Sequence, residues 1–340
     1  MKMNFYIAVF IVLVSAGISG CQKKYLPTDR DAFDLGSSFS TTVYHPVLGR
    51  TTLFTDNFKD ISSSKPLNFR MLNLRAFDGS AAPELLKPFP TLVWIKKYTG
   101  LETSLAEIEA KRKTEDHPLF EIRQHSGEFI MWSSARSSIL RPMPDSGYVF
   151  DVEVSNNGGR KIIEGLKLQP YRERDYEPNN ADLITGNVTN DVVHPLSVSN
   201  IIGDSSGIAL TAQDVEISFH QASFTGSSLT FKFLDDQNRL IDPAKFNLTD
   251  WAKLVHGFNM QKTGTYVKYD VAYPIPLVEL PTAYTNSTGT LAHLDFGYER
   301  LGFGGVRQVS GLLFDFSIFA KGDWEIVIAF TKETPRFDND

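Results

Sequence analysis

Cysteine is almost absent from this chain, since Cys21 is the only one in 340 residues. A single cysteine cannot form an intrachain disulfide, so the folded chain must be stabilised by burial of its core. The seven histidines show no His-x-x-x-His or His-Glu-x-x-His spacing. Because these zinc motifs are missing, we expect no metal site and no cofactor. Ligands that only the fold brings together remain the alternative.

A surplus of positive charge is also missing. The chain has 34 lysines and arginines against 40 aspartates and glutamates, which gives a net charge of −6. Proteins that bind nucleic acid need a basic surface to neutralise the phosphates. We therefore expect no nucleic-acid partner.

Long apolar runs are absent except near the N-terminus, where residues 5–14 are apolar throughout. This run of about ten residues is half of the roughly twenty that a membrane-spanning helix needs. Lys2 precedes the run and small residues follow it, which is the pattern of a secretory signal. We therefore expect residues 1–20 to be a signal peptide.

The signal ends in Ile18-Ser19-Gly20-Cys21, which resembles a bacterial lipobox. The resemblance implies that Cys21 is acylated and anchors the mature chain in the outer membrane, at the cell surface or the periplasmic face. An ordinary secretory signal beside a free thiol is the alternative. Residues 22–34 are polar and include Pro27, so residues 21–34 read as the lipidated cysteine and a tether.

The composition favours β-structure. Phenylalanine is abundant, with 25 residues, and threonine and valine recur in short runs. About 320 residues follow the signal, which is long for one core and favours two domains. We predict a mainly β protein with two tandem β-sandwich (immunoglobulin-like) domains, at residues 35–176 and 191–340. A polar, turn-rich stretch at residues 177–190 is the predicted linker.

Two local patterns define the first domain most clearly. Residues 148–154 and 160–168 read as paired strands around the turn Asn156-Asn157-Gly158-Gly159. The preceding Asp145-Ser146-Gly147-Tyr148 resembles the start of the penultimate strand of an immunoglobulin-like sandwich. One short helix is predicted to begin at Ser104-Leu105-Ala106-Glu107, which fits a capping box, and to end near Lys113.

No sequence motif supports catalysis. Gly203-Asp204-Ser205-Ser206-Gly207 matches G-x-S-x-G, but no helical pattern follows it, as a nucleophile elbow would require. We predict a surface loop there. Asp235, Asp236, Asn238 and Asp242 offer oxygen ligands for calcium, yet the glycine and final glutamate of an EF-hand loop are missing. The prediction is a protein that is not an enzyme, with a hydrolase as the least favoured reading.

Aromatic residues are the best candidates for ligand contact, because apolar sugar faces stack on exposed rings. Tyr266, Tyr269, Tyr273 and Tyr284 lie in or beside a proline-rich stretch that reads as a sheet edge, and Trp251 lies in a polar segment. Packing of the same rings in a sandwich core is the competing interpretation.

Four stretches give the chain a family resemblance. They are Arg172-Glu173-Arg174-Asp175-Tyr176-Glu177-Pro178, Val255-His256-Gly257-Phe258-Asn259-Met260, Arg300-Leu301-Gly302-Phe303-Gly304-Gly305 and Gly322-Asp323-Trp324-Glu325-Ile326. With them the chain resembles an uncharacterised lipoprotein family of the Bacteroidota, of the domain-of-unknown-function type. Such lipoproteins are associated with SusC/SusD-like glycan uptake systems, so the resemblance implies a glycan or outer-membrane uptake proteins as partners. It implies no catalytic residue.

The sequence thus favours a non-enzymatic outer-membrane lipoprotein that binds a glycan or assists a glycan-uptake system. The alternative is a structural or adhesion lipoprotein that acts through protein contacts, which exposed apolar patches or an open strand edge would favour.

Overall fold

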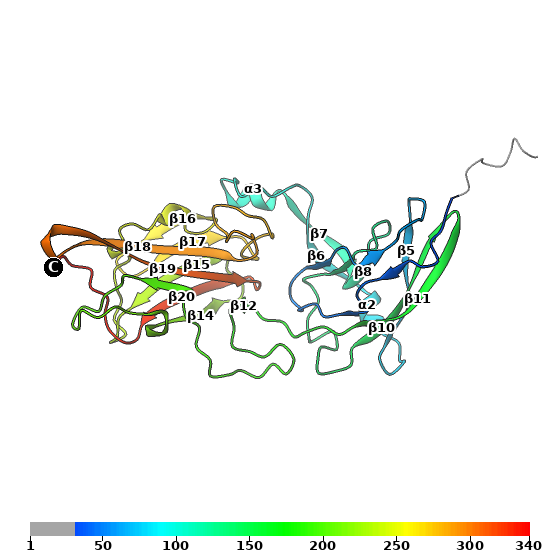
Figure 1. Ribbon diagram of the computed structural model, residues 1–340, viewed down its shortest axis with the longest axis horizontal. Coiled ribbons are helices and arrows are strands. Elements are labelled where there is room, and N and C mark those ends of the chain that lie inside the picture. The colour runs from blue at the N-terminus through cyan, green and yellow to red at the C-terminus, as the bar shows by residue number, and fades with distance from the viewer. Residues whose placement is uncertain (1–30) are drawn as a thin grey trace, which may run out of the picture.

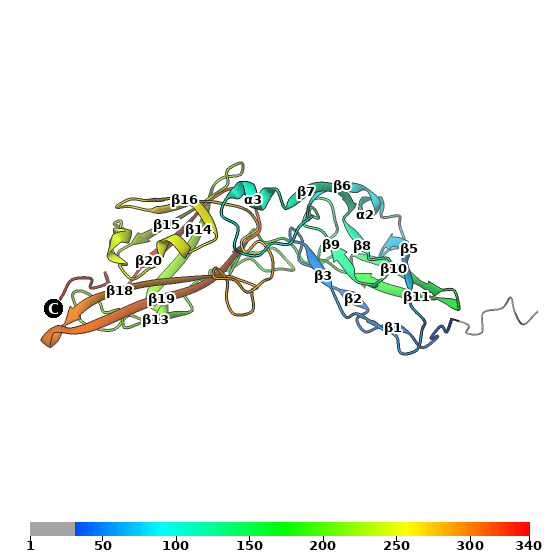
Figure 2. The same cartoon turned by 90° about the horizontal axis from the view of Figure 1, so that it is seen from above.

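The computed structural model describes residues 31–340, which form two β-rich domains placed end to end (Figures 1 and 2). The predicted signal peptide, Cys21 and most of the predicted tether lie outside the described residues. Within residues 31–340, no helix has both the length and the apolar character needed to cross a membrane. The chain enters at one end of the long axis and finishes at the other (Figure 1).

The first domain is a sandwich of two main sheets. Its strands are β1 (Ser38–Phe39), β2 (Val43–Tyr44), β3 (Thr52–Phe54), β4 (Phe58–Lys59), β5 (Asn68–Ala76), β6 (Pro88–Trp94), β7 (Arg112–Pro118), β8 (Phe120–Ile122), β9 (Phe129–Met131), β10 (Tyr148–Asn156) and β11 (Gly159–Leu168). One sheet has the order β2-β11-β10-β5 and the other β3-β9-β8. Rings from both sheets meet in the core, where Phe129 and Phe150 lie 5.3 Å apart, so burial of aromatic side chains holds the layers together.

The predicted hairpin of the first domain is confirmed. Strand β10 ends at Asn156, β11 begins at Gly159, and these two residues pair across the turn. Tyr148 starts β10, and its hydroxyl accepts a hydrogen bond from the Arg141 amide at 2.9 Å. A tyrosine that reaches back to upstream backbone in this way is typical of immunoglobulin-like domains. Gly147, just before it, has φ +70°, and a Cβ there would lie 2.2 Å from the Leu168 carbonyl oxygen.

The first domain has two short helices where the sequence predicted one. Helix α3 (Leu105–Glu109) is the predicted helix, and the Ser104 side chain caps it by accepting from the Glu107 amide. It ends at Glu109 rather than near Lys113, because β7 begins at Arg112. The other helix, α2 (Pro83–Leu86), is a single turn that proline starts, too short to leave a periodic pattern in the sequence.

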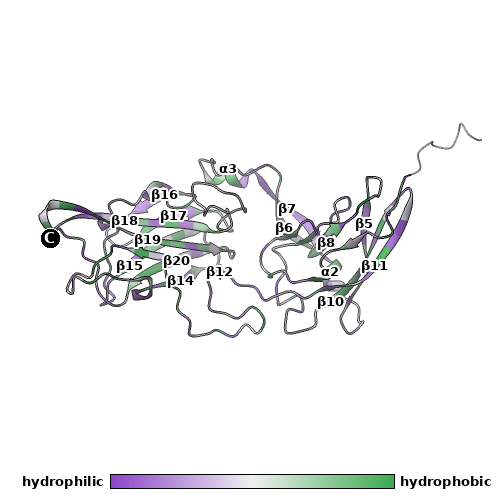
Figure 3. Ribbon diagram, in the orientation of Figure 1, coloured by the Kyte–Doolittle hydropathy of each residue, from purple (hydrophilic) through white to green (hydrophobic). Residues whose placement is uncertain are grey.

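The second domain is a larger sandwich. Its strands are β12 (Tyr176–Glu177), β13 (Ser197–Ser199), β14 (Val215–Ser223), β15 (Ser228–Leu234), β16 (Gly257–Lys262), β17 (Val267–Val271), β18 (Ala292–Gly302), β19 (Val306–Ile318) and β20 (Asp323–Phe330). One sheet has the order β14-β20-β15-β17-β16, and the other joins β18, β12 and β13 to β19. Hydrophobic and hydrophilic residues alternate along these strands (Figure 3), and in β18 every second residue from Ala292 to Gly302 is buried. The predicted mainly β sandwich fold is confirmed.

The tryptophans in or beside the strands differ in burial. Trp324 lies in the core with 3% of its surface exposed. Trp94 and Trp132 are half-buried. The Trp132 ring nitrogen donates to Glu121, which gives the polar edge of this ring a partner.

The chain crosses to the second domain at about Asp175, before the predicted linker. Tyr176 already pairs with Ile318 of β19. Residues 178–191 then form a loop that closes on itself, because the Thr189 amide donates to the Asn180 carbonyl. The predicted linker is therefore a loop beside the first strand of the second domain. Arg50 secures this crossing by pairing with Glu177 at 2.9 Å and lying over the Phe319 ring.

Candidate functional site

The first domain also extends an arm to the second. Residues 95–112, between β6 and β7, carry α3 and pack on residues 255–285. Ile108 of the arm is fully buried in a small cluster with Ala272 and Leu277. The buried Arg112 guanidinium donates to the Tyr273 carbonyl at 2.7 Å. We call this contact the domain joint.

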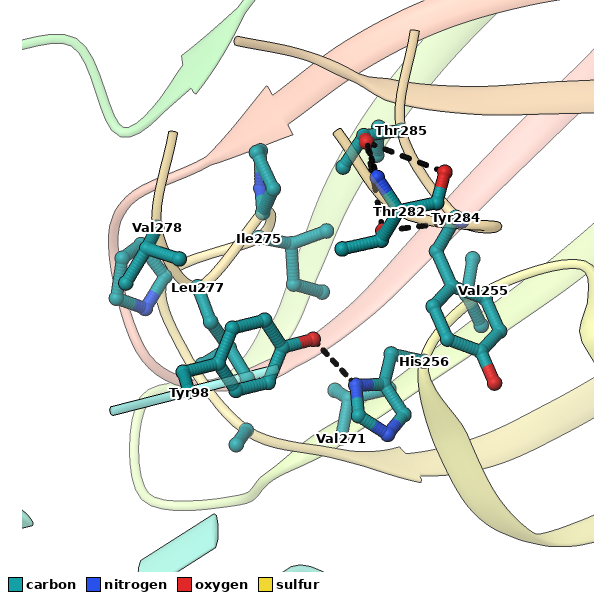
Figure 4. A pocket seen from close by; sticks show the side chains of 14 residues that line it. Tyr98, Val255, His256, Val271, Ile275, Leu277, Val278, Thr282, Tyr284 and Thr285 are labelled. Atoms are coloured by element: carbon teal, nitrogen blue, oxygen red, sulfur yellow. Dashed lines mark hydrogen bonds between the residues drawn. The ribbon is translucent and has the colours of Figure 1, made fainter. Parts of the chain in front are cut away.

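A tyrosine and a histidine meet at the centre of the domain joint (Figure 4). His256 Nε2 lies 2.8 Å from the Glu102 carbonyl oxygen, so Nε2 carries the proton and donates. Nδ1 is then the acceptor for the Tyr98 hydroxyl. Burial raises the pKa of Tyr98, which keeps that hydroxyl protonated and donating. The Tyr284 ring stacks on the imidazole, with the two ring centroids 4.6 Å apart.

A buried carboxylate holds the arm in shape. The Glu102 side chain is fully buried and accepts from the Thr99 amide, the Thr99 hydroxyl and Lys111 Nζ. Burial by itself raises the pKa of Glu102, but the hydrogen bonds from Lys111 and Thr99 outweigh it and lower the pKa to about 2. Glu102 is therefore ionised at neutral pH, and its own carbonyl is the one that His256 contacts.

The domain joint is packed rather than hollow. The free space among Tyr98, His256, Ile275, Leu277 and Tyr284 is about 20 Å³. A water molecule needs about 10–15 Å³ of such space, so the joint has room for about one. Ligand pockets are on the order of 300–1,000 Å³. The joint therefore fixes the two domains and does not admit a ligand of that size.

The structure places most of the predicted ligand-binding rings in the core. Trp251, Tyr269 and Tyr273 are 7%, 1% and 7% exposed. Their polar atoms serve the fold: Tyr269 donates to the Trp251 carbonyl at 2.5 Å, and Tyr273 donates to the Ser228 carbonyl at 3.0 Å. Rings buried in this way offer no face to a ligand. The proline-rich stretch predicted as a sheet edge instead packs against the first domain.

The other two predicted rings are half-buried and lie apart. Tyr284 packs on His256 in the domain joint, whereas Tyr266 directly precedes β17. No row of exposed rings forms from the five predicted residues. The stacking platform expected for a glycan is therefore not made by this set.

A second, open hollow of about 410 Å³ lies in the second domain. It is bordered by the loop of residues 178–191 and by the chain that leads into β13. We call it the polar hollow, because its lining is mostly polar, with Arg174, Asn179, Asn180, Asp182, Thr189, Asp191 and His194. Its volume falls within the range of ligand pockets. Sequence reasoning missed it because the loop was read as a linker.

Both donors and acceptors line the polar hollow. His194 Nδ1 donates to the Val215 carbonyl at 2.8 Å, which leaves Nε2 as an acceptor. Asn180 Nδ2 donates to the Thr189 carbonyl at 3.0 Å, which leaves its Oδ1 as an acceptor. The Arg174 guanidinium donates to the Ala181 carbonyl and shares the lining with Asp182 and Asp191, so one positive charge stands against two negative ones. The hydrogen bonds from Thr185 lower the pKa of Asp182.

The remaining motifs form turns and loops. The serines of the G-x-S-x-G stretch surround Glu333, which accepts from the amides of Ser205 and Ser206. Ser205 has no histidine among its hydrogen-bond partners in the described part of the chain. Asp235 caps its turn by accepting from the Gln237 and Arg239 amides. Across residues 31–340, no group of three or more His, Cys, Asp or Glu side chains gathers as a metal site would require.

The family model described as a domain of unknown function (DUF5007) matches residues 58–339, which include most of both domains. The chain therefore belongs to this family, and the predicted resemblance to a domain-of-unknown-function family is confirmed. No curated protein and no solved structure matches the chain. Assignment to the Bacteroidota and association with SusC/SusD-like systems stay predictions.

Proposed function

We propose that this protein is a non-enzymatic lipoprotein of the outer membrane that binds a neutral, hydroxyl-rich ligand of the glycan class in the polar hollow. The observation that carries the proposal is the size and lining of this hollow, about 410 Å³ among side chains that can donate and accept. The family resemblance adds the expectation that the protein assists a glycan-uptake system beside outer-membrane uptake proteins.

The charge of the polar hollow disfavours an anionic ligand. Arg174 contributes one positive charge to the lining against the two negative charges of Asp182 and Asp191, and this surplus of negative charge repels an anion. Sugar hydroxyls both donate and accept, which matches the arginine donors and the acceptors at Asn180, Asp191 and His194. The lining has no phenylalanine, tyrosine or tryptophan, so hydrogen bonds rather than stacking would provide recognition.

Affinity electrophoresis and calorimetry against a panel of polysaccharides and their oligosaccharides test the proposal. The soluble chain from residue 22 should be retarded by one polymer class. The double variant Asn180→Ala/His194→Ala should lose at least about 10-fold in affinity, because two acceptors are removed from one ligand.

A matched control uses an exposed amide and an exposed imidazole outside the hollow. Gln237→Ala/His220→Ala should bind like the unchanged chain, since neither residue borders the hollow. Absence of retardation by every polymer, or equal loss in both double variants, would refute the glycan proposal.

The anchor is tested separately at Cys21. We propose that this residue carries the lipid, on the lipobox that precedes it. The Cys21→Ser protein should take up no labelled palmitate and should leave the outer-membrane fraction. Retention of both properties in that variant would contradict the lipoprotein assignment.

A further inference from the structure

The longest hairpin of the protein, β18 and β19, extends beyond the second sandwich to the end of the molecule (Figures 1 and 2). Its turn, residues 302–305, exposes an unusual amount of apolar surface. Phe303 is 93% exposed, and Leu301, Val306 and Val309 are 48%, 57% and 52% exposed. We call these four residues the hairpin tip. Exposed apolar groups gathered at one place are typical of interaction sites.

The C-terminal residues hold the hairpin tip in place without covering it. Asp340 pairs with the buried Arg300 guanidinium at 2.6 Å and accepts from the Phe303 amide at 3.0 Å. The Leu301 amide donates to the Asn339 side chain at 2.6 Å, and the Asp340 amide donates to the Leu301 carbonyl. A tip fixed in this way loses little freedom on binding, which favours association.

Charges around the hairpin tip neutralise one another. Arg307 pairs with Glu299, Arg300 pairs with Asp340, and Arg336 pairs with both Asp204 and Asp340. A loop that inserts into a bilayer gains from basic residues that face anionic lipid, and these arginines are already paired. The tip also lies at the opposite end of the long axis from residue 31, which belongs to the predicted tether (Figure 1). Both observations favour a protein over the anchoring membrane.

We propose that the hairpin tip docks into an apolar socket of a partner protein located beyond the end of the molecule distal to the tether. Phe303 in the turn is the central anchor, with Leu301 and Val306 beside it at the ends of the two strands and Val309 farther along β19. Aromatic side chains that fill a pocket near the centre of an interface provide much of the binding energy. The partner requires no complementary charge, because the charges of the tip are already paired.

Site-specific photo-crosslinking on the full lipid-anchored chain tests this docking. A photoreactive phenylalanine analogue replaces Phe303 and, as the control, Phe224, which is 79% exposed in the turn before β15. In native membranes, a protein cross-linked from position 303 and not from position 224 is identified, purified and measured for direct binding. Phe303→Ser should weaken binding by at least about 10-fold, whereas Phe224→Ser should change it less than about 2-fold.

The same variants separate docking to a partner protein from a folding defect and from binding of another occupant at the hairpin tip. Because Phe303 is almost fully exposed, Phe303→Ser should leave the melting temperature unchanged. No cross-link specific to position 303, or equal binding by both variants, would overturn the proposal. Sedimentation of the lipid-free chain with anionic vesicles would also overturn the proposal if Phe303→Ser abolishes that sedimentation. Self-association of the chain would do the same if Phe303→Ser abolishes the self-association. We expect these changes to leave polysaccharide binding unaltered. Failure of the docking proposal can therefore be distinguished from failure of the glycan proposal.

Discussion

The buried Glu102–Lys111 pair should stabilise the arm that joins the two domains, and Glu102→Gln tests it. Glutamine keeps the shape of the side chain but cannot carry the charge that Lys111 pairs with. The loop from residue 99 to residue 103 should loosen, and the Glu102 carbonyl would no longer be held against His256. We expect a weaker domain joint and a protein of lower stability.

The size of the expected loss in stability follows from the pKa of Glu102. The Glu102 pKa falls from an ordinary 4.5 to about 2 on folding. Each unit corresponds to about 1.4 kcal/mol, so the ionised form contributes about 3 kcal/mol. At pH values between 2 and 4.5, Glu102 binds a proton more readily in the unfolded chain than in the folded chain. This contribution is therefore complete above about pH 4.5 and is lost as the pH falls towards 2.

Urea unfolding followed by tryptophan fluorescence measures this effect at several pH values. At pH 7, Glu102→Gln should lower the unfolding free energy by about 3 kcal/mol, and the difference from the unchanged chain should narrow below pH 4.5. The control Asp250→Asn alters a largely exposed pair with Lys253 and should change stability by less than about 1 kcal/mol. A loss no greater than the control at pH 7, or one independent of pH, would refute the reasoning.

Other changes test the core and the tyrosine contact by chemical denaturation, and the domain joint by limited proteolysis. Phe296→Ala should cost about 3–5 kcal/mol, because the fully buried ring leaves a cavity among its aromatic neighbours; a cost near 1 kcal/mol would contradict this packing. Tyr148→Phe should cost about 1–3 kcal/mol, since the Arg141 amide and Glu84 lose their partner; a neutral result would contradict the contact. Gly100→Ala should weaken the domain joint, because its φ is +75° and a Cβ would lie 2.6 Å from Thr282 Cγ2; unchanged protection from proteolysis across the joint would contradict this.

Local sequence signals succeeded where neighbours along the chain decide the structure. The turn at Asn156-Asn157-Gly158-Gly159 formed because asparagine and glycine accept the backbone angles of a tight hairpin. Ser104 started a helix because its side chain caps the first turn. Alternation of apolar and polar residues over 292–298 produced a half-buried strand. These signals were sufficient for the mainly β fold class.

The aromatic rings predicted to contact a ligand show what local sequence signals do not determine. Tyr269 and Tyr273 read as ligand contacts because they lie in or beside a proline-rich stretch, yet both are buried in the core of the second sandwich. Nothing near them in the sequence indicates that Arg112 approaches the Tyr273 carbonyl, since these residues are far apart along the chain. Burial of a ring depends on such distant segments, which periodicity cannot register.

The sequence by itself determined what depends on composition and nearest neighbours. This comprises the lack of an intrachain disulfide, the acidic balance, the strand pattern and the helix cap at Ser104. The tertiary structure alone decided which aromatic side chains are buried and how Asp340 braces an exposed Phe303. The physical reason is that these contacts join residues distant in the chain, whereas local backbone geometry is set by adjacent ones.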